Sequence, residues 1–386
     1  CVLPLFCCGA GACAGSCVDQ AAGTPYSPII ADPILEPWRW HEEEVLRGLG
    51  VICMAEADDG TLWFGNGGLT HYDGVTVSHI PFDDALLARI THHKRNPRAK
   101  ALSILPDGSP LVLIGESLVH RSGDEWNVII DDTGRSVFVA MLEQAEDGSV
   151  WLLVPDAVWR INADLSEAVR VMTARRNGFF GSFSFDPNGT LWIVEKTDSS
   201  HARLVSIPSN ERGGDPDAAQ REYPIPFETD ATQISITASK DGRIWYGDDS
   251  VRTALAIFDP GENAWSMCEG APEKRYFSLS TGKDGTIWAG GEKLIFRVSP
   301  TGKPTFYSGD KLPRPQVPLS MFETDDNRLW VIGRVGYVHF VDIGYSQWMT
   351  YEQLHFQCET SGGTQWFRSK KRDVVVSYDP ATAVWT

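Results

Sequence analysis

The sequence contains no apolar run of the roughly 18–20 residues that a membrane-spanning helix needs. It also lacks "GxSxG", "HExxH" and a Gly-rich phosphate loop followed by a helix, so no common catalytic motif indicates an enzyme. Basic residues are outnumbered, because 34 Lys and Arg stand against 51 Asp and Glu, which gives a net charge of −17. Binding to nucleic acid or to an anionic membrane surface rests on clustered positive charge, so neither is an expected general partner.

Groups that could hold a metal are also thinly spread. The nine histidines are scattered, and only His92 and His93 adjoin. A metal site needs several His, Cys or carboxylate groups that converge, whereas adjacent side chains on a strand face opposite ways. We therefore place this pair in a solvated loop and expect neither a metal nor another cofactor.

What the sequence does contain is a repeat. The stretch "DGTLWFGNGGLTHYDG", residues 59–74, places a turn, a tryptophan-centred strand, a Gly-rich turn and a second strand in sixteen residues, and related stretches recur at spacings of 36 to 53 residues. Each copy has one large apolar anchor, which is leucine in the second copy. The anchors are Trp63, Leu111, Trp151, Trp192, Trp245, Trp288, Trp330 and Trp366.

Each copy is typical of four short strands. Asp-Gly and Asn-Gly between alternating apolar runs predict hairpins with type I′ turns. The Asp residues come one to a copy, without the dense spacing of a calcium loop, and are interpreted as turn residues. One indole per copy, facing the next copy, would bury on the order of 150–250 Å².

A four-stranded sheet that repeats every 40–50 residues or so predicts an all-β fold, a single β-propeller. The count is eight blades, or seven if the Leu111 copy or the short last copy is only a connection. We assign 46–386 to the propeller and 18–45 to a lead-in, of which residues 26–45 are a candidate for an outer strand that closes the ring.

The run "GLGVICMAEADDGTLWFGNGGLTHYDG" resembles the two-component-regulator propeller repeat, which occurs in bacterial periplasmic sensors and in related secreted or lipid-anchored proteins. The run "KDGTIWAGGEKLIFRVSPTGK" is similar to the virginiamycin B lyase propellers. The resemblance covers about nine tenths of the chain and implies an architecture. It does not imply an activity, because propellers host enzymes, receptors and scaffolds alike.

The first seventeen residues, "CVLPLFCCGAGACAGSC", are small and apolar and include five of the eight cysteines. Secretory signals are apolar runs that end in small residues, so we interpret this stretch as the tail of a truncated signal sequence. A cysteine after "AGS" resembles the lipobox of bacterial lipoproteins, with Cys17 as the lipidated residue. Cys13 and Cys8 are alternatives, as is a plain signal remnant or a small disulfide cluster.

Only Cys53, Cys268 and Cys358 lie outside this stretch, and an odd number gives no disulfide framework. Cys53 and Cys358 precede the anchors of the first and last copies. A disulfide between them across the ring closure is one alternative. Free thiols are the favoured interpretation, because crowded inner strands suit small apolar residues.

The two ends of the predicted ring differ in charge. Turns between first and second strands are rich in Asp. The connections between blades have a net charge of +2, whereas the rest of the sequence has a net charge of −19. The connections counted are 82–100, 172–180, 208–233, 268–277 and 308–318. Basic residues concentrate in "RITHHKRNPRAK" and "RSKKR", which ring closure would place in one sector.

We predict that this sector binds an anionic group, such as an acidic glycan or the carboxylates of a protein partner. The alternative is that basic loops only reduce the self-repulsion of an acidic protein. The candidate binding residues are Lys94, Arg95, Arg98, Lys370, Lys371 and Arg372.

These features favour an extracytoplasmic recognition or scaffold module of a bacterial envelope, sensor-like and without catalytic activity, that binds a ligand or protein at the loop-bearing end. The alternative is an enzyme of the lyase or lactonase type, which would need a His and carboxylates at the channel mouth. His71, His120 and His339 fall in third strands, away from the axis. They are interpreted as solvated sheet positions, so no catalytic residue is assigned.

Overall fold

Eight four-stranded antiparallel sheets account for most of the regular structure in the computed structural model. The described residues are 29–30, 32–90, 97–134, 140–209, 220–250, 255–308, 312, 318–333, 337–344, 349–350, 354–370, 374–382 and 384–386. The predicted all-β architecture of four-stranded blades is thus confirmed. The chain divides into two units, Asp32–Tyr345 with seven of these sheets, and Cys1–Ala31 plus Ser346–Thr386 with the eighth.

Each sheet of Asp32–Tyr345 is one blade. Blade 1 comprises β3 (Cys53–Glu56), β4 (Leu62–Gly65), β5 (Gly68–Tyr72) and β6 (Val77–Pro81), and blade 2 comprises β7 (Ala99–Ile104), β8 (Pro110–Ile114), β9 (Ser117–Ser122) and β10 (Glu125–Ile130). Blade 3 comprises β11 (Met141–Gln144), β12 (Val150–Val154), β13 (Ala157–Ile161) and β14 (Ala168–Thr173), and blade 4 comprises β15 (Phe179–Phe185), β16 (Leu191–Lys196), β17 (Ala202–Ile207) and β18 (Arg221–Pro224). Blade 5 comprises β19 (Ile234–Ala238), β20 (Ile244–Asp248), β21 (Ala256–Asp259) and β22 (Ala264–Met267), and blade 6 comprises β23 (Tyr276–Thr281), β24 (Ile287–Gly291), β25 (Leu294–Val298) and β26 (Pro304–Ser308). Blade 7 comprises β27 (Pro318–Glu323), β28 (Arg328–Gly333), β29 (Val338–Asp342) and, as its outermost strand, β2 (Trp40–Glu42).

The turn between the first two strands has one geometry in all seven blades. In blade 2 the N–H of Leu105 donates to the carbonyl of Ser109, and the N–H of Gly108 donates back to Leu105. Gly108 has a φ of 81°, whereas Asp107 before it is not in the left-handed region. The predicted type I′ turn, which needs two positive φ values, is therefore wrong. The structure has the longer hairpin loop with a single left-handed residue, and the Asp side chain accepts the N–H of Ser109.

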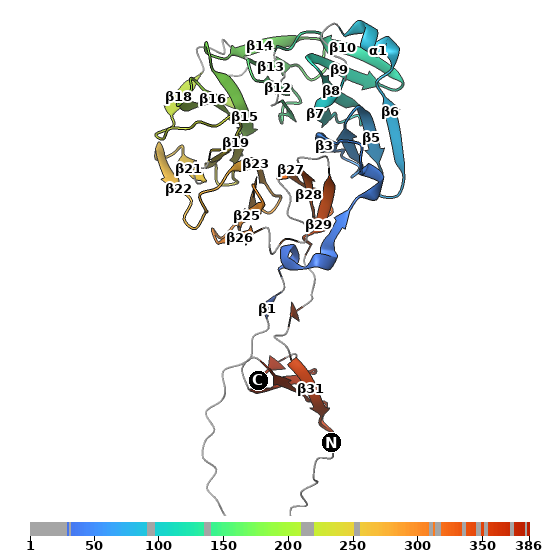
Figure 1. Ribbon diagram of the computed structural model, residues 1–386, viewed down its shortest axis with the longest axis vertical. Helices are drawn as coiled ribbons and strands as arrows, with labels where there is room; N and C mark the ends of the chain where they lie inside the picture. Colours follow the sequence, from blue (N-terminus) through green and yellow to red (C-terminus); the bar gives the residue numbers. More distant parts are fainter. Residues whose placement is uncertain are drawn as a thin grey trace, which may run out of the picture. The chain divides into compact units, whose positions relative to one another are not determined.

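The seven blades follow one another around a circle (Figure 1). Blade 7 meets blade 1 directly, since Trp330 and Phe64 lie in one apolar cluster with ring centroids 5.6 Å apart. Five tryptophan anchors are almost fully buried between blades, with exposed fractions of at most 4%. They are Trp151, Trp192, Trp245, Trp288 and Trp330. The apolar core is therefore divided into a series of interfaces between neighbouring sheets.

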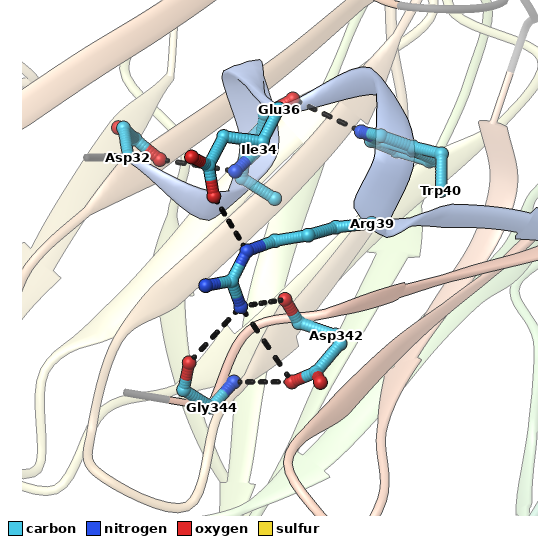
Figure 2. Close-up of polar contacts among 7 residues, drawn as sticks. All are labelled: Asp32, Ile34, Glu36, Arg39, Trp40, Asp342 and Gly344. Atoms are coloured by element: carbon cyan, nitrogen blue, oxygen red, sulfur yellow. Dashed lines mark hydrogen bonds and ion pairs between the residues drawn. The ribbon is translucent and has the colours of Figure 1, made fainter. Parts of the chain in front are cut away.

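Ring closure is achieved by the segment that precedes blade 1. Strand β2 pairs with β29 antiparallel, with Trp40 opposite Val341, and it lies inside the segment 26–45 for which a closing strand was expected. Figure 2 shows how a buried arginine holds this segment: Arg39 donates from Nε to Glu36 and from one terminal nitrogen to the carbonyls of Asp342 and Gly344. The seventh sheet is thus completed before the eighth copy of the repeat begins.

Four short helices lie in the connections of the described part of this unit. They are η1 (Pro33–Leu35), η2 (Pro37–Arg39), η3 (Glu44–Leu46) and α1 (Asp84–Arg89). In η1 the carboxylate of Asp32 accepts the N–H of Ile34, and Pro33 occupies the first position, where a missing N–H costs nothing. In α1 the carboxylate of Asp83 accepts the N–H of Leu86 in the same way.

The second unit holds a two-stranded sheet of β1 (Ile29–Ile30) and β30 (Met349–Thr350) and the eighth four-stranded sheet. The strands of that sheet are β31 (Leu354–Glu359), β32 (Gln365–Ser369), β33 (Val375–Asp379) and β34 (Val384–Trp385). Its anchor, Trp366, is 38% exposed. Among the described residues this unit offers no second four-stranded sheet to cover the indole, so the interface predicted for this copy is not formed within it. Cys53, Cys268 and Cys358 are free thiols.

Candidate functional site

The blade interfaces of Asp32–Tyr345 follow one register. The anchor on each second strand faces the next blade and shares an apolar cluster with one third-strand residue of that blade. In each blade the anchor pairs with one residue of the third strand, and the residue directly after that partner contacts the anchor of the preceding blade. In blade 4, for example, Trp192 pairs with Ser206, and the next residue, Ile207, lies in one cluster with Trp151. Six interfaces have an apolar or aromatic residue there. The pairs are Trp330 with Tyr72, Leu111 with Ile161, Trp151 with Ile207, Trp192 with Phe258, Trp245 with Val298, and Trp288 with Val341.

The interface between blades 1 and 2 departs from this register. His120 pairs with Leu111, so the corresponding residue is Arg121. A guanidinium cannot replace an apolar contact, because a charged group that leaves water must be paired or hydrogen-bonded. Its carbon Cζ lies 5.7 Å from the ring centroid of Trp126, on the outer strand of its own blade. The anchor of blade 1, Trp63, is consequently only half-buried.

A groove of about 300 Å³ lies at this interface. Its lining residues are Trp63, Ile80, Asp107, Gly108, Ser109, Pro110, Arg121 and Gly123. Blade 2 contributes the turns that follow its first and third strands, so the groove lies at the turn-bearing end of the ring. This end is opposite to the loop-bearing end, at which the sequence predicted binding.

Arg121, which lines this groove, has one hydrogen-bond donor without a partner. Its Nε donates to the carbonyl of Gly123 at 2.8 Å, and one terminal nitrogen donates to Asp124 at 2.9 Å. The other terminal nitrogen, Nη1, is buried and has no hydrogen-bond partner. An unpaired buried donor of this kind costs the fold about 1–3 kcal/mol.

Asp107, a second lining residue, supplies a carboxylate. Its Oδ1 accepts the Ser109 N–H at 2.9 Å and the Ser109 hydroxyl at 2.5 Å. These hydrogen bonds, together with the nearby His120, lower the pKa of Asp107 below its usual value. The carboxylate is therefore ionised at neutral pH, and the groove carries one positive and one negative group.

Ser109 and His120 lie close enough to invite comparison with a nucleophile and its base, since Ser109 Oγ is 2.7 Å from His120 Nε2. The carboxylate, however, is on the serine side. With the hydroxyl donating to Asp107, His120 Nε2 must donate to the serine oxygen and cannot accept its proton. In a catalytic triad the carboxylate orients the histidine instead. This trio is therefore a hydrogen-bonded turn and not an activated serine.

Carboxylates near the axis at the same end are used to join blades. Glu323 Oε2 accepts the indole N–H of Trp288 at 3.0 Å, which links blade 7 to blade 6. Glu56 accepts the N–H of Asp325 at 2.9 Å, which links blade 1 to blade 7. Lys283 forms an ion pair with Asp325. These charged groups therefore have structural partners.

The structure describes two of the six predicted binding residues. Arg98 is exposed just before β7, and Lys370 is exposed just after β32. They belong to different units, Arg98 to Asp32–Tyr345 and Lys370 to the other unit. The remaining predicted residues lie outside the described part of the chain. They are Lys94, Arg95, Lys371, Arg372 and the lipidation candidate Cys17.

The predicted solvated positions of the third-strand histidines need one correction. His71 and His120 are half-buried, and the ring centroid of His71 lies 4.6 Å from that of Trp63. His339 is only 4% exposed, because β2 adds an outer strand next to β29 and covers it. Within the described residues no group of three or more His, Cys, Asp or Glu side chains could hold a metal ion.

Comparison with solved structures identifies the architecture. Virginiamycin B lyase from Staphylococcus aureus matches with a TM-score of 0.60 at 13% identity, over 78% of this chain and 98% of the lyase. YCF48 bound to D1 peptide matches with a TM-score of 0.59 at 13% identity, over 83% of this chain and 100% of YCF48. The fold is a β-propeller.

A third match is to an extracellular domain. The extracellular domain of a hybrid two-component system protein from B. thetaiotaomicron has a TM-score of 0.56 at 13% identity, over 90% of this chain and 48% of that domain. Both resemblances drawn from the sequence are thus confirmed at the level of structure. At these identities the likeness establishes the fold alone. No protein-family model and no curated protein matches the sequence, and no helix among the described residues is long and apolar enough to span a bilayer.

Proposed function

We propose that this protein is an extracytoplasmic recognition module, without catalytic activity, whose ligand binds in the groove between blades 1 and 2. The observation that carries the proposal is Arg121, which occupies the one interface register filled by an apolar or aromatic residue in the other six blades. The Trp63 indole is half-buried at this interface, and Arg121 lines the same groove. An aromatic surface with a few placed polar groups is typical of a small-molecule site.

Replacing Trp63 with leucine is expected to weaken ligand binding at least about tenfold, which corresponds to ~1.4 kcal/mol. Leucine occupies the same anchor position in blade 2, as Leu111, so the fold should accept it. The measurement is binding of the full chain to a panel of neutral and acidic sugars, amino acids and small carboxylates. Trp38→Leu is the matched control, because Trp38 is 59% exposed outside the groove. Equal binding by both variants would contradict the proposed site.

A second candidate is the pair of basic segments predicted from the sequence, one in each unit, in which Arg98 and Lys370 are exposed. An unidentified protein partner or an acidic glycan would bind there through charge-assisted bonds. The same panel therefore includes a variant with Lys94, Arg95, Arg98 and Lys370–Arg372 reversed to Glu, measured at low and moderate salt. Salt-sensitive binding of acidic glycans that survives this reversal would remove the candidate.

We also propose that the protein is held at a bacterial envelope, on the periplasmic or outer side, by a lipid on Cys17. The small, apolar stretch 1–17 supports this anchor, and an extracellular sensor domain among the similar folds supports export. In a bacterial host, Cys17→Ala is expected to abolish fatty-acid labelling and to move the protein from the membrane to the soluble fraction. Undiminished labelling of that variant would show that Cys17 is not the modified residue.

A further inference from the structure

Resting on the proposed function, we infer that the ligand of the groove is a small zwitterion with an apolar ring or side chain, such as an aromatic α-amino acid. The decisive feature is the presence of two opposite charges, Arg121 and Asp107, in the lining of one groove without an ion pair between them. Arg121 pairs instead with Asp124. A ligand with one carboxylate and one ammonium group can satisfy both.

The size of the groove limits the occupant. A volume of about 300 Å³ lies at the lower end of the usual range for small-molecule sites, about 300–1,000 Å³. It accommodates one ring or one branched side chain together with an amino-acid backbone. A folded protein segment or a long oligosaccharide would have to lie mostly outside it.

The positive side of the groove selects a carboxylate. Arg121 supplies the positive charge of the groove lining, and its ion-pair partner, Asp124, has a fully exposed side chain, so that ion pair is weak. A charge-assisted hydrogen bond from a guanidinium to a carboxylate is about twice as strong as a neutral one. A neutral amide at the same place would lose the attraction between the two opposite charges.

The negative side selects a donor that carries positive charge. Asp107 Oδ1 is occupied by the Ser109 N–H and hydroxyl, which leaves Oδ2 to receive the ligand. An ionised carboxylate is acceptor-only, so it binds an ammonium group and repels a second anion. A plain carboxylate ligand without the ammonium group therefore gains from Arg121 and loses at Asp107.

The apolar side is formed by Trp63, Ile80 and Pro110. An aromatic ring placed against the indole buries apolar area and gains about 0.5–1.5 kcal/mol beyond that area. This surface has no counterpart at the other tryptophan anchors of the ring, whose indoles are covered. The side chain of the ligand accordingly points to Trp63, and its charged backbone points to Arg121 and Asp107.

The test compares four ligands on the full chain by titration calorimetry or saturation-transfer NMR: L-phenylalanine, L-phenylalaninamide, 3-phenylpropionate and glucuronate. Phenylalanine is expected to bind at least about tenfold more tightly than each of the other three. In the Arg121→Ile variant, phenylalanine is expected to bind no more tightly than phenylalaninamide. In the Asp107→Asn variant, phenylalanine is expected to bind no more tightly than phenylpropionate. Both variants use residues found at the same positions elsewhere in the ring, Ile161 in blade 3 and Asn188 in blade 4.

The outcomes separate this inference from the proposed function. If phenylpropionate or glucuronate binds as tightly as phenylalanine and that binding is lost in Trp63→Leu, the zwitterion is wrong and the groove remains the site. If no member of either panel binds at millimolar concentration, both the ligand class and the groove are wrong. Binding of phenylalanine that ignores Arg121→Ile and Asp107→Asn also overturns the inference.

Discussion

Replacing Arg39 with alanine is expected to lower the free energy of unfolding by about 3–5 kcal/mol, because removing one partner of a buried ion pair leaves the other charge uncompensated. Arg39 is 3% exposed, and its Nε lies 2.6 Å from Glu36 Oε2. The same guanidinium donates to the carbonyls of Asp342 and Gly344, at 3.1 and 3.3 Å (Figure 2). The substitution therefore leaves a buried carboxylate and two carbonyls without their donor.

The effect should reach beyond these contacts, because Arg39 secures the segment that closes the ring. Ile34 and Leu46 of this segment are fully buried in the clusters of blades 6–7 and 7–1. Asp32, at its start, accepts hydrogen bonds from Arg297 and Tyr307 of blade 6. Losing the segment would expose the outer edge of blade 7 and both apolar clusters at once.

The measurement is urea or thermal unfolding of the full chain, with Arg47→Ala as the matched control. Arg47 pairs with Glu42 at 2.7 Å in the same segment, but its side chain is 52% exposed. Exposed pairs of this kind contribute about 0–1 kcal/mol. If the two variants lose similar amounts of stability, Arg39 does not hold the closure.

The repeat itself was accessible from the sequence because its signals are local. A Gly in the left-handed turn position and a large apolar residue a few positions later recur in nearly every copy, for example Gly108 with Leu111 and Gly285 with Trp288. Burial of the anchors then follows from the need of each sheet to cover its apolar face. The exposed Trp366 shows the limit of this inference, because burial depends on a neighbouring sheet and not on the copy alone.

The groove was not accessible in the same way. Leu111 was visible as a missing tryptophan, yet its own interface is well packed, with Ile161 in the same cluster. The residue that opens a site is Arg121, and its significance depends on which third-strand residue faces which anchor. A comparison of this third-strand position in all copies would have identified Arg121 as the exception. That comparison requires the strand registers, which the sequence does not provide.

The charge pattern predicted from the loops was limited for a similar reason. It combined the segments 89–100 and 368–372, which belong to different units, and the outer position of blade 7 is occupied by β2. The segment 26–45 contained the relevant signal, "PWRWHEEEV", which combines aromatic residues with a single arginine among acids. Sequence alone did not reveal that Arg39 is buried there.

Glu143 is expected to make the protein less stable as pH rises toward and through neutrality. It lies on β11 opposite Trp151, and burial raises its pKa from 4.5 to about 7. Between pH 4.5 and about 7, the Glu143 carboxyl is therefore protonated in the folded state and ionised in the unfolded state. This contribution to stability is fully present below pH 4.5 and is lost as pH rises through about 7. Its size is up to about 3 kcal/mol, at ~1.4 kcal/mol for each pKa unit.

Glu143→Gln keeps the shape of the side chain and removes its charge, so the variant should unfold like the wild type near pH 4 and be more stable by up to about 3 kcal/mol at pH 8. The quantity to measure is the difference in unfolding free energy between variant and wild type from pH 4 to pH 8, because other titrating groups cancel in it. Glu146→Gln is the control, since Glu146 lies exposed in the following turn, and it should change stability by less than about 0.5 kcal/mol throughout. A difference for Glu143→Gln that stays constant with pH would contradict this prediction, because it would mean that the pKa of Glu143 is the same in the folded and the unfolded protein.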